Sequence, residues 1–495
     1  MTSRLALAIV VFAAAPAGAA TCESLSTFSG PRVAVTLART VGAGEFTPPG
    51  RGGRGVNAFA NLPPFCRVAA TLTPSSDSDI KIEVWLPASG WNGKLEAVGN
   101  GAWAGNISYP AMATALAAGY AAVSTDTGHA GGDAKFMVGH PEKLVDFEER
   151  AVHEMTVTAK AILNGYYGTP PKQSYFNGCS TGGRQALTEA QRYPLDFDAI
   201  VAGAPANAVR RQTFGQIWLW QATHTDEASL LTPEKYAVLH KAALDRCDAL
   251  DGVKDGVIEN PRQCTFDPAV TLCKSGDAAD CLTAPQVEAA KKIYAGASHA
   301  KTHQPLYPGL EPGSETGWNM SVAARPVNYA EDFFKYVVYN DAGWDPKSLN
   351  YDTDVVAADK VKTGLDATNA DLSTFVGHGG KLLIYHGWSD PGIPPRNSVD
   401  YYERAVAATP NARGAIRLFM VPGMGHCGGG DGTSTFDMVA AVDTWVQTKT
   451  APVTIPASRM ADGKVVRTRP LCAYPAVASY KGTGSTDDAA SFVCR

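Results

Sequence analysis

The sequence lacks the two features that would indicate a nucleic acid or a membrane as partner. Its 495 residues carry a formal net charge of only −5, which is far from the strongly basic balance of nucleic-acid-binding or polybasic membrane proteins. Beyond the first 20 residues, no apolar run is long enough to span a bilayer. We therefore expect no nucleic-acid partner and no membrane partner.

Several motifs of metal and phosphate chemistry are missing as well. The chain contains no H-E-x-x-H, no zinc-type cluster of cysteine and histidine, and no G-x-x-x-x-G-K-[ST]. It also has no internal repeat and no low-complexity segment. With 45% hydrophobic residues, the chain can bury a large core and is long enough for a catalytic domain with an insertion.

The N-terminus is typical of a secretory signal. Arg4 precedes the apolar run 5–15 and the small residues 16–20, so we predict a signal peptide over 1–20 and a secreted or periplasmic protein. All ten cysteines lie beyond this segment. An even set in an oxidising compartment predicts five disulfides rather than free buried thiols.

Strand-like and helix-like segments alternate in the first 205 residues and again after residue 380. Residues 81–87 alternate polar and apolar, 94–98 and 120–125 are strand-like, and 381–386 is a buried apolar run. This alternation predicts an α/β domain with a parallel sheet covered on both faces, over 21–205 and 376–495. The alternation of strand-like and helix-like segments is absent between these two parts of the chain, and we predict a disulfide-bonded insertion or lid over 206–375.

A G-x-S-x-G pattern lies at Gly178-Cys179-Ser180-Thr181-Gly182. It follows an aromatic strand-like run and precedes the helix-favouring segment 184–190, which is the setting of a nucleophile elbow. In a chain with 49 glycines, the pattern alone could occur by chance. A base, an orienting acid and an oxyanion hole are needed to support it.

An acid and a base follow Ser180 in the chain, each directly after a strand-like segment. Asp390 follows 382–385, and His426 follows 416–421. In α/β-hydrolases the triad has the chain order Ser, Asp or Glu, His. We therefore predict an α/β-hydrolase fold with a large lid between nucleophile and acid, with His426 as general base and Asp390 orienting it. Taken singly, each residue could be an ordinary loop residue.

The cysteines sharpen this prediction, because Cys179 precedes Ser180 and Cys427 follows His426. If the serine and the histidine come within hydrogen-bond reach, their neighbours are close enough to be bridged. Proximity along the chain suggests three more pairs, and the last pair remains by elimination. The four further pairs are Cys247–Cys264, Cys273–Cys281, Cys472–Cys494 and Cys22–Cys66.

The oxyanion hole requires two backbone N–H donors. One is expected from Thr181, the residue after the nucleophile, and the other from the glycine-rich loop 99–105, where Gly101 is the candidate. A simple turn between two elements is the alternative for that loop.

A second constellation lies in the insertion, within 247–258. Its carboxylates and carbonyls suit a hard cation such as Ca²⁺, although the spacing is not that of an EF-hand and a solvated acidic turn is the alternative. An ion here would be structural, because the hydrolytic site already has its full set of groups. The ligands expected are Asp248, Asp251, Val253, Asp255 and Val257.

Together these motifs resemble the tannase and feruloyl esterase family of secreted serine esterases, which also includes mono(2-hydroxyethyl) terephthalate hydrolase. The resemblance covers the mature chain and is specific at 178–185, 387–390, 425–427, 99–101 and 247–258. It implies an α/β-hydrolase core, a lid, a disulfide beside the serine and the histidine, calcium in the lid loop, and esters of aromatic acids such as gallate and ferulate as substrates.

The resemblance also implies lid aromatics that grip the substrate ring. Trp318 is the main candidate, with Phe334 and Tyr336 behind it, and the lid's own core is the alternative for all three. The terephthalate-ester hydrolase uses a lid arginine for a free carboxylate. The segment 333–339 has none, although Arg325 or Lys335 could substitute.

We thus expect a secreted serine esterase that hydrolyses hydroxycinnamic or hydroxybenzoic esters through an acyl-enzyme. The ester would be a small aromatic one, free or attached to plant polysaccharide or polyphenol. The alternatives are a terephthalate half-ester hydrolase and, from another class, a secreted aromatic- or carbohydrate-binding protein without catalysis. The sequence leaves the oligomeric state open.

Overall fold

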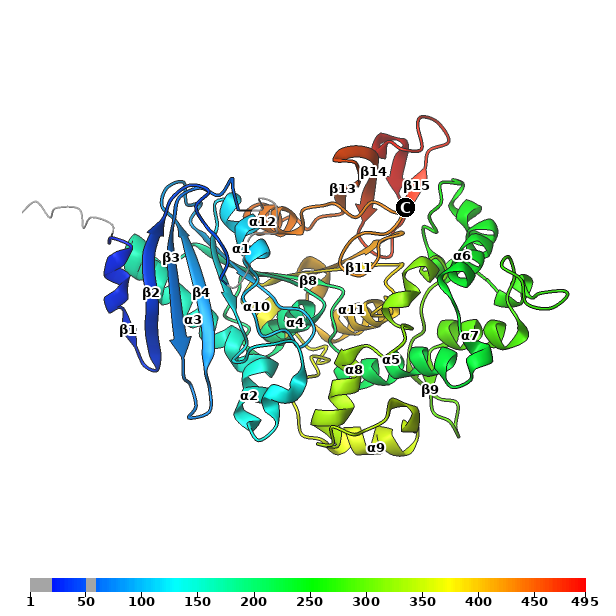
Figure 1. Ribbon diagram of the computed structural model, residues 1–495. Coiled ribbons are helices and arrows are strands. Elements are labelled where there is room, and N and C mark those ends of the chain that lie inside the picture. The colour runs from blue at the N-terminus through cyan, green and yellow to red at the C-terminus, as the bar shows by residue number, and fades with distance from the viewer. Residues whose placement is uncertain (1–19, 50–58) are drawn as a thin grey trace, which may run out of the picture.

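A computed structural model describes residues 20–49 and 59–495; the predicted signal peptide lies outside them except for Ala20. At the centre is a ten-stranded sheet of order β1-β2-β3-β4-β6-β5-β7-β8-β11-β12 (Figure 1). Its strands are β1 Ser29–Gly30, β2 Val33–Val41, β3 Phe65–Leu72, β4 Ile80–Pro87, β5 Lys94–Val98, β6 Ala121–Thr125, β7 Gln173–Cys179, β8 Ala199–Gly203, β11 Lys381–Gly387 and β12 Ile416–Val421.

The sheet is antiparallel at one end and parallel at the other. Strands β1 to β4 pair antiparallel, as do β4 and β6, whereas β6, β5, β7, β8, β11 and β12 are all parallel. The parallel strands are almost wholly buried, β8 at every residue, while β2 alternates with exposed positions. This difference follows from helices covering both faces of the parallel part.

Two helical layers cover the sheet. On one face α3 (Ala151–Tyr167), α4 (Thr181–Arg192) and α11 (Arg396–Ala408) enclose one large apolar core. On the other face α1 (Tyr109–Ala117) and α12 (Met438–Thr448) enclose a second core. The predicted α/β architecture is therefore confirmed.

The residues between β8 and β11 form an excursion from the sheet, because these two strands are hydrogen-bonded neighbours with Ala199 opposite Lys381. The excursion lies on the opposite side of the molecule from β1 to β4 (Figure 1). At its ends, the Ala367 N–H donates to the Asn207 carbonyl at 2.8 Å, and the Asn207 side chain donates to the Ala367 carbonyl at 3.2 Å.

Two apolar cores involve this insertion: the one around Leu239 and Ile293 is its own, whereas the one around Phe214 and Phe333 also includes Trp103 of the sheet domain. The insertion is mainly helical, with one short strand pair. Its elements are α5 Val209–His224, α6 Pro233–Cys247, α7 Ala284–Ala295, β9 Ala297–Ser298, β10 Pro305–Tyr307, α8 Asn328–Asp332, α9 Thr353–Lys360 and α10 Ser373–Gly377, and α2 (Pro141–Val145) precedes it in the chain.

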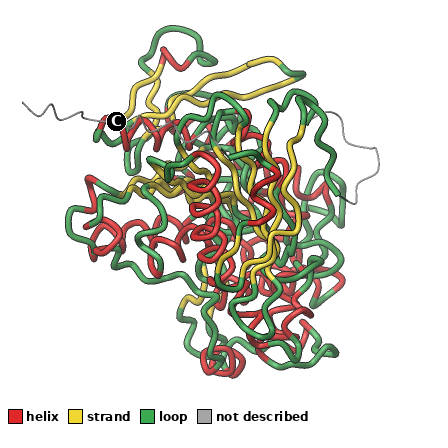
Figure 2. Tube along the Cα trace, turned by 90° about the vertical axis from the view of Figure 1, so that its left-hand side faces the viewer, coloured by secondary structure: helices red, strands yellow, loops and turns green. Residues whose placement is uncertain are grey.

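After α12 the chain forms a hairpin of β13 (Thr454–Ala461) and β14 (Lys464–Cys472), then a small pair of β15 (Ala478–Tyr480) and β16 (Phe492–Cys494). The hairpin turn Asp462-Gly463 has positive φ at both residues, the geometry that suits a two-residue hairpin loop. These strands stand at the upper edge of the molecule in both views (Figures 1 and 2).

Five disulfides join the ten cysteines, in the predicted pairing: Cys22–Cys66, Cys179–Cys427, Cys247–Cys264, Cys273–Cys281 and Cys472–Cys494. Such a set forms in an oxidising compartment. Over the described residues, 20–49 and 59–495, no helix combines the length and apolar character needed to cross a membrane.

Candidate active site

Ser180 occupies a sharp turn between β7 and α4. Its backbone has φ 65° and ψ −120°, a strained conformation for a residue with a side chain. The turn demands glycine, because a Cβ on Gly178 would lie 2.6 Å from the carbonyl carbon of Gly182. The Ser180 N–H donates to the Gly203 carbonyl of the neighbouring strand at 3.0 Å. This is the geometry of a nucleophile elbow.

The acid and the base come from the loops after β11 and β12. His426 Nδ1 lies 2.7 Å from Asp390 Oδ2. His426 and Ser180 line one cavity of about 80 Å³, so the structure gathers the three predicted triad residues. No hydrogen bond joins the two described side chains of Ser180 and His426; in unliganded hydrolases this bond often tightens only when substrate binds.

Asp390 is fully buried, and its carboxylate is surrounded by donors. Oδ1 accepts from the N–H groups of Gly392 at 2.8 Å and Ile393 at 3.0 Å. Burial acts to raise the pKa of Asp390, but the charge of His426 and hydrogen bonds from His386 and His426 outweigh it and hold that pKa below its usual range. These contacts therefore favour the ionised form of Asp390.

His426 shows the complementary balance. Burial acts to lower its pKa, but the charge of Asp390 and the hydrogen bond to it prevail, so the pKa of His426 is raised. The pair therefore favours the imidazolium that forms when His426 takes a proton from a serine.

His386, which the sequence did not single out, is a second histidine on the same carboxylate. Its Nε2 lies 3.0 Å from Asp390 Oδ2 and 3.0 Å from the Ile393 carbonyl, and its Nδ1 lies 2.7 Å from Ser398 Oγ. Both Nε2 partners are acceptors, so Nε2 carries a proton. His386 and His426 therefore share one oxygen of Asp390, Oδ2.

The disulfide Cys179–Cys427 joins the nucleophile turn to the base loop, with the two Cα atoms 6.0 Å apart. Each cysteine is adjacent in sequence to one of the reacting residues, Ser180 or His426. The bridge therefore fixes the separation of two loops that no sheet pairing connects.

The glycine-rich loop after β5 lies against the elbow. The Gly182 N–H donates to the Asn100 carbonyl at 2.8 Å, and Thr181 Oγ1 donates to the Ala102 carbonyl at 3.0 Å. Thr181 is the first residue of α4, where backbone N–H groups have no acceptor within the helix. Thr181 and Ala102 line the cavity, and Gly101 directly precedes Ala102. The oxyanion roles of Gly101 and Thr181 remain predictions.

The rest of the cavity wall is neutral. Gln212 and Gln216, one turn apart on α5, belong to this wall, and the side-chain oxygen of each is buried without a hydrogen-bond partner among the described residues. The Gln216 Nε2 group is occupied, donating to the Gly392 carbonyl at 3.2 Å. Burial raises the pKa of Tyr329 to about 12, so its phenol keeps its proton. The other wall residues are Ala206, Met320, Val327, Gly392 and Ile393.

The aromatic residues predicted to grip the substrate lie elsewhere. Trp318 is buried in an insertion core, its Nε1 donating to Ser314 Oγ at 2.9 Å. Phe334 stacks on Trp344, and Tyr336 packs on the same core as Phe334. None of the three lines the cavity with Ser180. Trp318 and Phe334 are buried inside the insertion and Tyr336 is partly buried against it, and the substrate-gripping role of the three stays a prediction.

The two cations considered for binding a free carboxylate are also engaged. Arg325 Nη2 lies 3.0 Å from Glu331 Oε1, and Lys335 Nζ lies 2.6 Å from the same oxygen. Neither lines the cavity. No lysine or arginine occurs among the twelve residues of its wall, all of which belong to the described chain.

The predicted calcium loop is closed by its own hydrogen bonds. Asp248 accepts from the N–H groups of Asp255 at 3.1 Å and Gly256 at 2.9 Å, and Asp251 accepts from Val253 N–H at 2.9 Å. Burial, followed by the charges of Asp255 and Asp248, raises the pKa of Asp251. The loop therefore concentrates negative charge.

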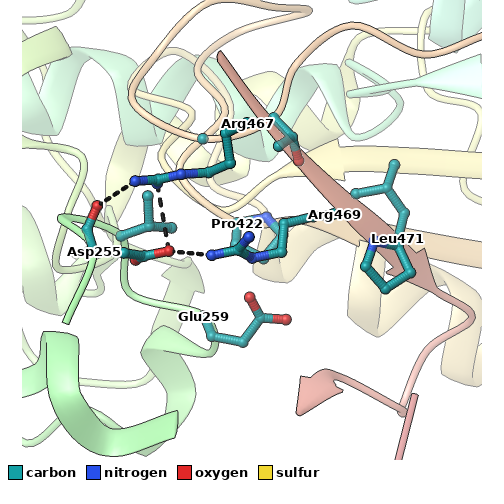
Figure 3. A pocket seen from close by; sticks show the side chains of 10 residues that line it. Asp255, Glu259, Pro422, Arg467, Arg469 and Leu471 are labelled. Carbon is teal, nitrogen blue, oxygen red and sulfur yellow. Dashed lines mark hydrogen bonds and ion pairs between the residues drawn. The ribbon is translucent and has the colours of Figure 1, made fainter. Parts of the chain in front are cut away.

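Two arginines of the C-terminal hairpin meet this loop, as Figure 3 shows. Asp255 pairs with Arg469 and with Arg467. Across residues 20–49 and 59–495, no group of three or more His, Cys, Asp or Glu side chains is placed to hold a metal ion. The oxygen donors match the chemistry of Ca²⁺, but here arginines and N–H groups occupy much of their capacity, and calcium remains a prediction.

Comparison with known proteins places this geometry among esterases. The family model described as tannase and feruloyl esterase matches residues 66–495. An uncharacterized esterase of Xanthomonas campestris is 39% identical, over 96% of this chain and 91% of that protein. A probable feruloyl esterase B-2 of Aspergillus oryzae is 34% identical, over 87% of this chain and 86% of that protein.

Solved structures agree. The crystal structure of feruloyl esterase B from Aspergillus oryzae superimposes with a TM-score of 0.89 at 31% identity, covering 96% of this chain and 99% of that one. Tannin acyl hydrolase from Aspergillus niger gives 0.76 at 21% identity, with 94% and 92% covered, and shows the fold alone. The predicted α/β-hydrolase fold is confirmed.

Proposed function

The chain belongs to the tannase and feruloyl esterase family of carboxylic ester hydrolases, and from that premise we propose that it hydrolyses esters of phenolic aromatic acids at Ser180. The observation that carries the proposal is the cavity in which an elbow serine and an aspartate-held histidine meet a neutral wall with free amide oxygens.

In the proposed reaction, His426 Nε2 takes the Ser180 proton as Oγ attacks the ester carbonyl carbon. The carbonyl π electrons move to oxygen, where backbone N–H groups of the Thr181 and Gly101 region stabilise the charge. Collapse of the intermediate breaks the C–O bond, and His426 protonates the leaving alcohol. Water, deprotonated by His426, then attacks the acyl-enzyme and releases the acid.

The proposed preference for phenolic acids rests on the cavity wall. Gln212 Oε1 and Gln216 Oε1 are acceptors without partners, and a buried acceptor left unpaired is costly. A phenolic hydroxyl on the substrate ring would donate to them. A free carboxylate would find no lysine or arginine in this wall, which disfavours a terephthalate half-ester.

The test compares three esters: methyl caffeate, which has ring hydroxyls, methyl cinnamate, which has none, and mono(2-hydroxyethyl) terephthalate. We expect kcat/KM to fall in that order, with caffeate about five- to thirtyfold above cinnamate, since one hydrogen bond to a buried group contributes about 1–2 kcal/mol. Equal rates for caffeate and cinnamate, or fastest hydrolysis of the half-ester, would contradict the proposed specificity.

Two variants separate chemistry from specificity. Ser180→Ala should abolish turnover and labelling by a fluorophosphonate probe while the fold persists. Gln212→Leu removes one acceptor at similar size and should lower kcat/KM for caffeate while leaving cinnamate nearly unchanged. Gln447→Leu, on the far side of the sheet and exposed, is the matched control. An equal loss on both esters in Gln212→Leu would show a purely structural role.

Two further expectations accompany this function. The protein is proposed to be secreted, in keeping with its five disulfides. A structural Ca²⁺ is proposed at the loop of Asp248, Asp251 and Asp255, supported by the hard oxygen donors that these three carboxylates offer. The ion would contribute stability there, and no step of the ester hydrolysis passes through it.

A further inference from the structure

A second cavity, of about 650 Å³, lies between α1 and α12 on the sheet face opposite α4. It shares no residue with the cavity of Ser180. Its volume is within the range of small-molecule sites. Strands β5, β7 and β11 contribute Glu96, Asn177 and Tyr385 to it, and the first turns of α12 contribute Asp437 and Thr444.

Glu96 is the polar group on which the cavity is centred. The residue is 5% exposed, and its Oε1 accepts from Asn177 Nδ2 at 3.1 Å. No described donor lies within hydrogen-bond distance of Oε2, yet Oε2 is not sealed from solvent. A carboxylate oxygen that is unpaired and reaches open space only through a cavity is aimed into that cavity.

The remaining charges leave the cavity acidic. Lys94 is its one cation among the described wall residues, and Lys94 is paired with Asp443. Asp443 is further held by the Tyr175 hydroxyl at 2.7 Å and by Gln447 at 2.8 Å. Asp437 uses Oδ1 to cap α12 through the Ala440 N–H at 2.8 Å, and it is exposed at the rim. Glu96 and Asp437 are therefore unbalanced.

Aromatic surface completes the site. Tyr385 and Phe436 meet edge to face, with ring centroids 5.3 Å apart, and Tyr120 lies on the same wall. Aromatic faces beside unbalanced carboxylates are a setting that attracts organic cations.

We propose that this cavity binds an organic cation, with an ammonium or guanidinium group on Glu96 Oε2 and its carbon skeleton against Tyr385 and Phe436. The floor carboxylate provides the charge-assisted hydrogen bond, and Asp437 at the rim attracts a second positive group. A neutral polyol would find acceptors here but would leave both charges uncompensated, so the cation is favoured.

The pH dependence of binding affinity distinguishes a cationic ligand from a neutral polyol. Burial, opposed by Asn177 and reinforced by Asp437, raises the pKa of Glu96 to about 7. The other titratable groups facing the cavity are Lys94, Asp443, Asp437, Tyr120 and Tyr385, and the pKa values of Asp443, Tyr120 and Tyr385 are shifted further from neutrality. Cation affinity should therefore rise about tenfold from pH 6 to pH 8 as Glu96 ionises.

The experiment is isothermal titration of the full chain with agmatine, which carries an ammonium and a guanidinium, and with xylobiose as a neutral polyol. We expect agmatine to bind more tightly at pH 8 than at pH 6. Glu96→Gln, of the same shape, should lose at least tenfold in affinity. Glu288→Gln, exposed and in an i,i+3 pair with Lys291, should bind like the parent.

A second variant guards against misfolding of Glu96→Gln. Asp437→Asn retains a capping side chain for α12 and should lower agmatine affinity two- to fivefold. Hydrolysis of methyl caffeate should be unchanged in both variants, which separates this site from the proposed function. No agmatine binding at pH 8, undiminished binding in Glu96→Gln, or xylobiose binding more tightly than agmatine would overturn the proposal.

Discussion

Removing the bridge between Cys179 and Cys427 should affect stability and catalysis together, whereas removing another disulfide should affect stability alone. The perturbation is the double substitution Cys179→Ala/Cys427→Ala. Its comparison is Cys273→Ala/Cys281→Ala, within the insertion and apart from the triad. The two bridges span 248 and 8 residues of chain, which separates their expected effects.

The magnitude follows from the chain entropy of the unfolded state. A bridge that closes a loop of n residues stabilises by an amount that grows with ln n, which gives about 5 kcal/mol for the long loop and about 2.5 kcal/mol for the short one. The first double variant should thus lose roughly twice as much unfolding free energy as the second. In addition, it frees the loop of His426, and a misplacement of about 1 Å at a reacting group lowers kcat on the order of a hundredfold.

The assay is urea unfolding of both variants beside the parent, followed by kcat and KM on methyl caffeate at a temperature where all three are folded. We expect kcat to fall only in the Cys179/Cys427 variant, with KM little changed. A variant with full kcat would show that packing alone positions His426. Equal losses of unfolding free energy in the two variants would refute the entropic argument.

Three further predictions concern charge and position. Asp390 raises the pKa of His426 above its ordinary value of 6.5, and His426 stops acting as a base as the pH falls through that raised pKa, so the acid limb of kcat/KM should lie above pH 6.5. Asp390→Asn should move this limb to lower pH. A limb that does not move would show that the Asp390–His426 pair does not cause it. His386→Asn should lower kcat on the order of tenfold and shift the same acid limb. KM should stay nearly constant, because His386 holds Asp390 without touching substrate. A loss of stability with an unchanged pH profile would show that His386 has a structural role only. Chelation by EDTA should lower the thermal unfolding midpoint, and added Ca²⁺ should restore it in the parent but not in Asp251→Asn. If EDTA does not change the midpoint, the charge of the loop is balanced by Arg467 and Arg469 without a metal ion.

The sequence predicted the parts of the site that depend on local chemistry. The elbow could be recognised because its glycines are required by contacts within five residues, as the Gly178 and Gly182 approach shows. The disulfide partners followed from adjacency to Ser180 and His426. The elbow geometry is determined by neighbours along the chain, and the Cys179–Cys427 bridge follows from the requirement that Ser180 and His426 meet.

The parts that sequence reasoning missed depend on how the chain turns back in three dimensions. His386 and Asp390 are only four residues apart, but the loop after β11 has to return the Asp390 carboxylate to His386 Nε2 before the two can pair. Which insertion residues face the cavity depends on how α5 packs on the sheet, so Trp318 could not be told from a core residue. One signal was available: Gln212 and Gln216 are amides four apart on a buried helix, which places both on one face.

The hairpin arginines are a similar case. Asp255 and Arg469 are separated by 214 residues, and nothing in either segment indicates the other. The acidic loop therefore suggested a cation, whereas the structure supplies two arginine side chains on one of its carboxylates (Figure 3).

The reciprocal hydrogen bonds between Asn207 and Ala367 have a consequence for how such enzymes diversify. They tie together the two points at which the insertion leaves and rejoins the sheet, and β8 and β11 remain neighbours whatever lies between them. Recombination at these two points would exchange a whole substrate-facing module and leave the catalytic serine, aspartate and histidine in the recipient. Matched partners would be needed across the contact with the sheet domain, among them Glu311 with Arg396, Asp255 with Arg469 and Thr363 with Glu148. Lineages could thus acquire new ester preferences by module exchange rather than residue by residue.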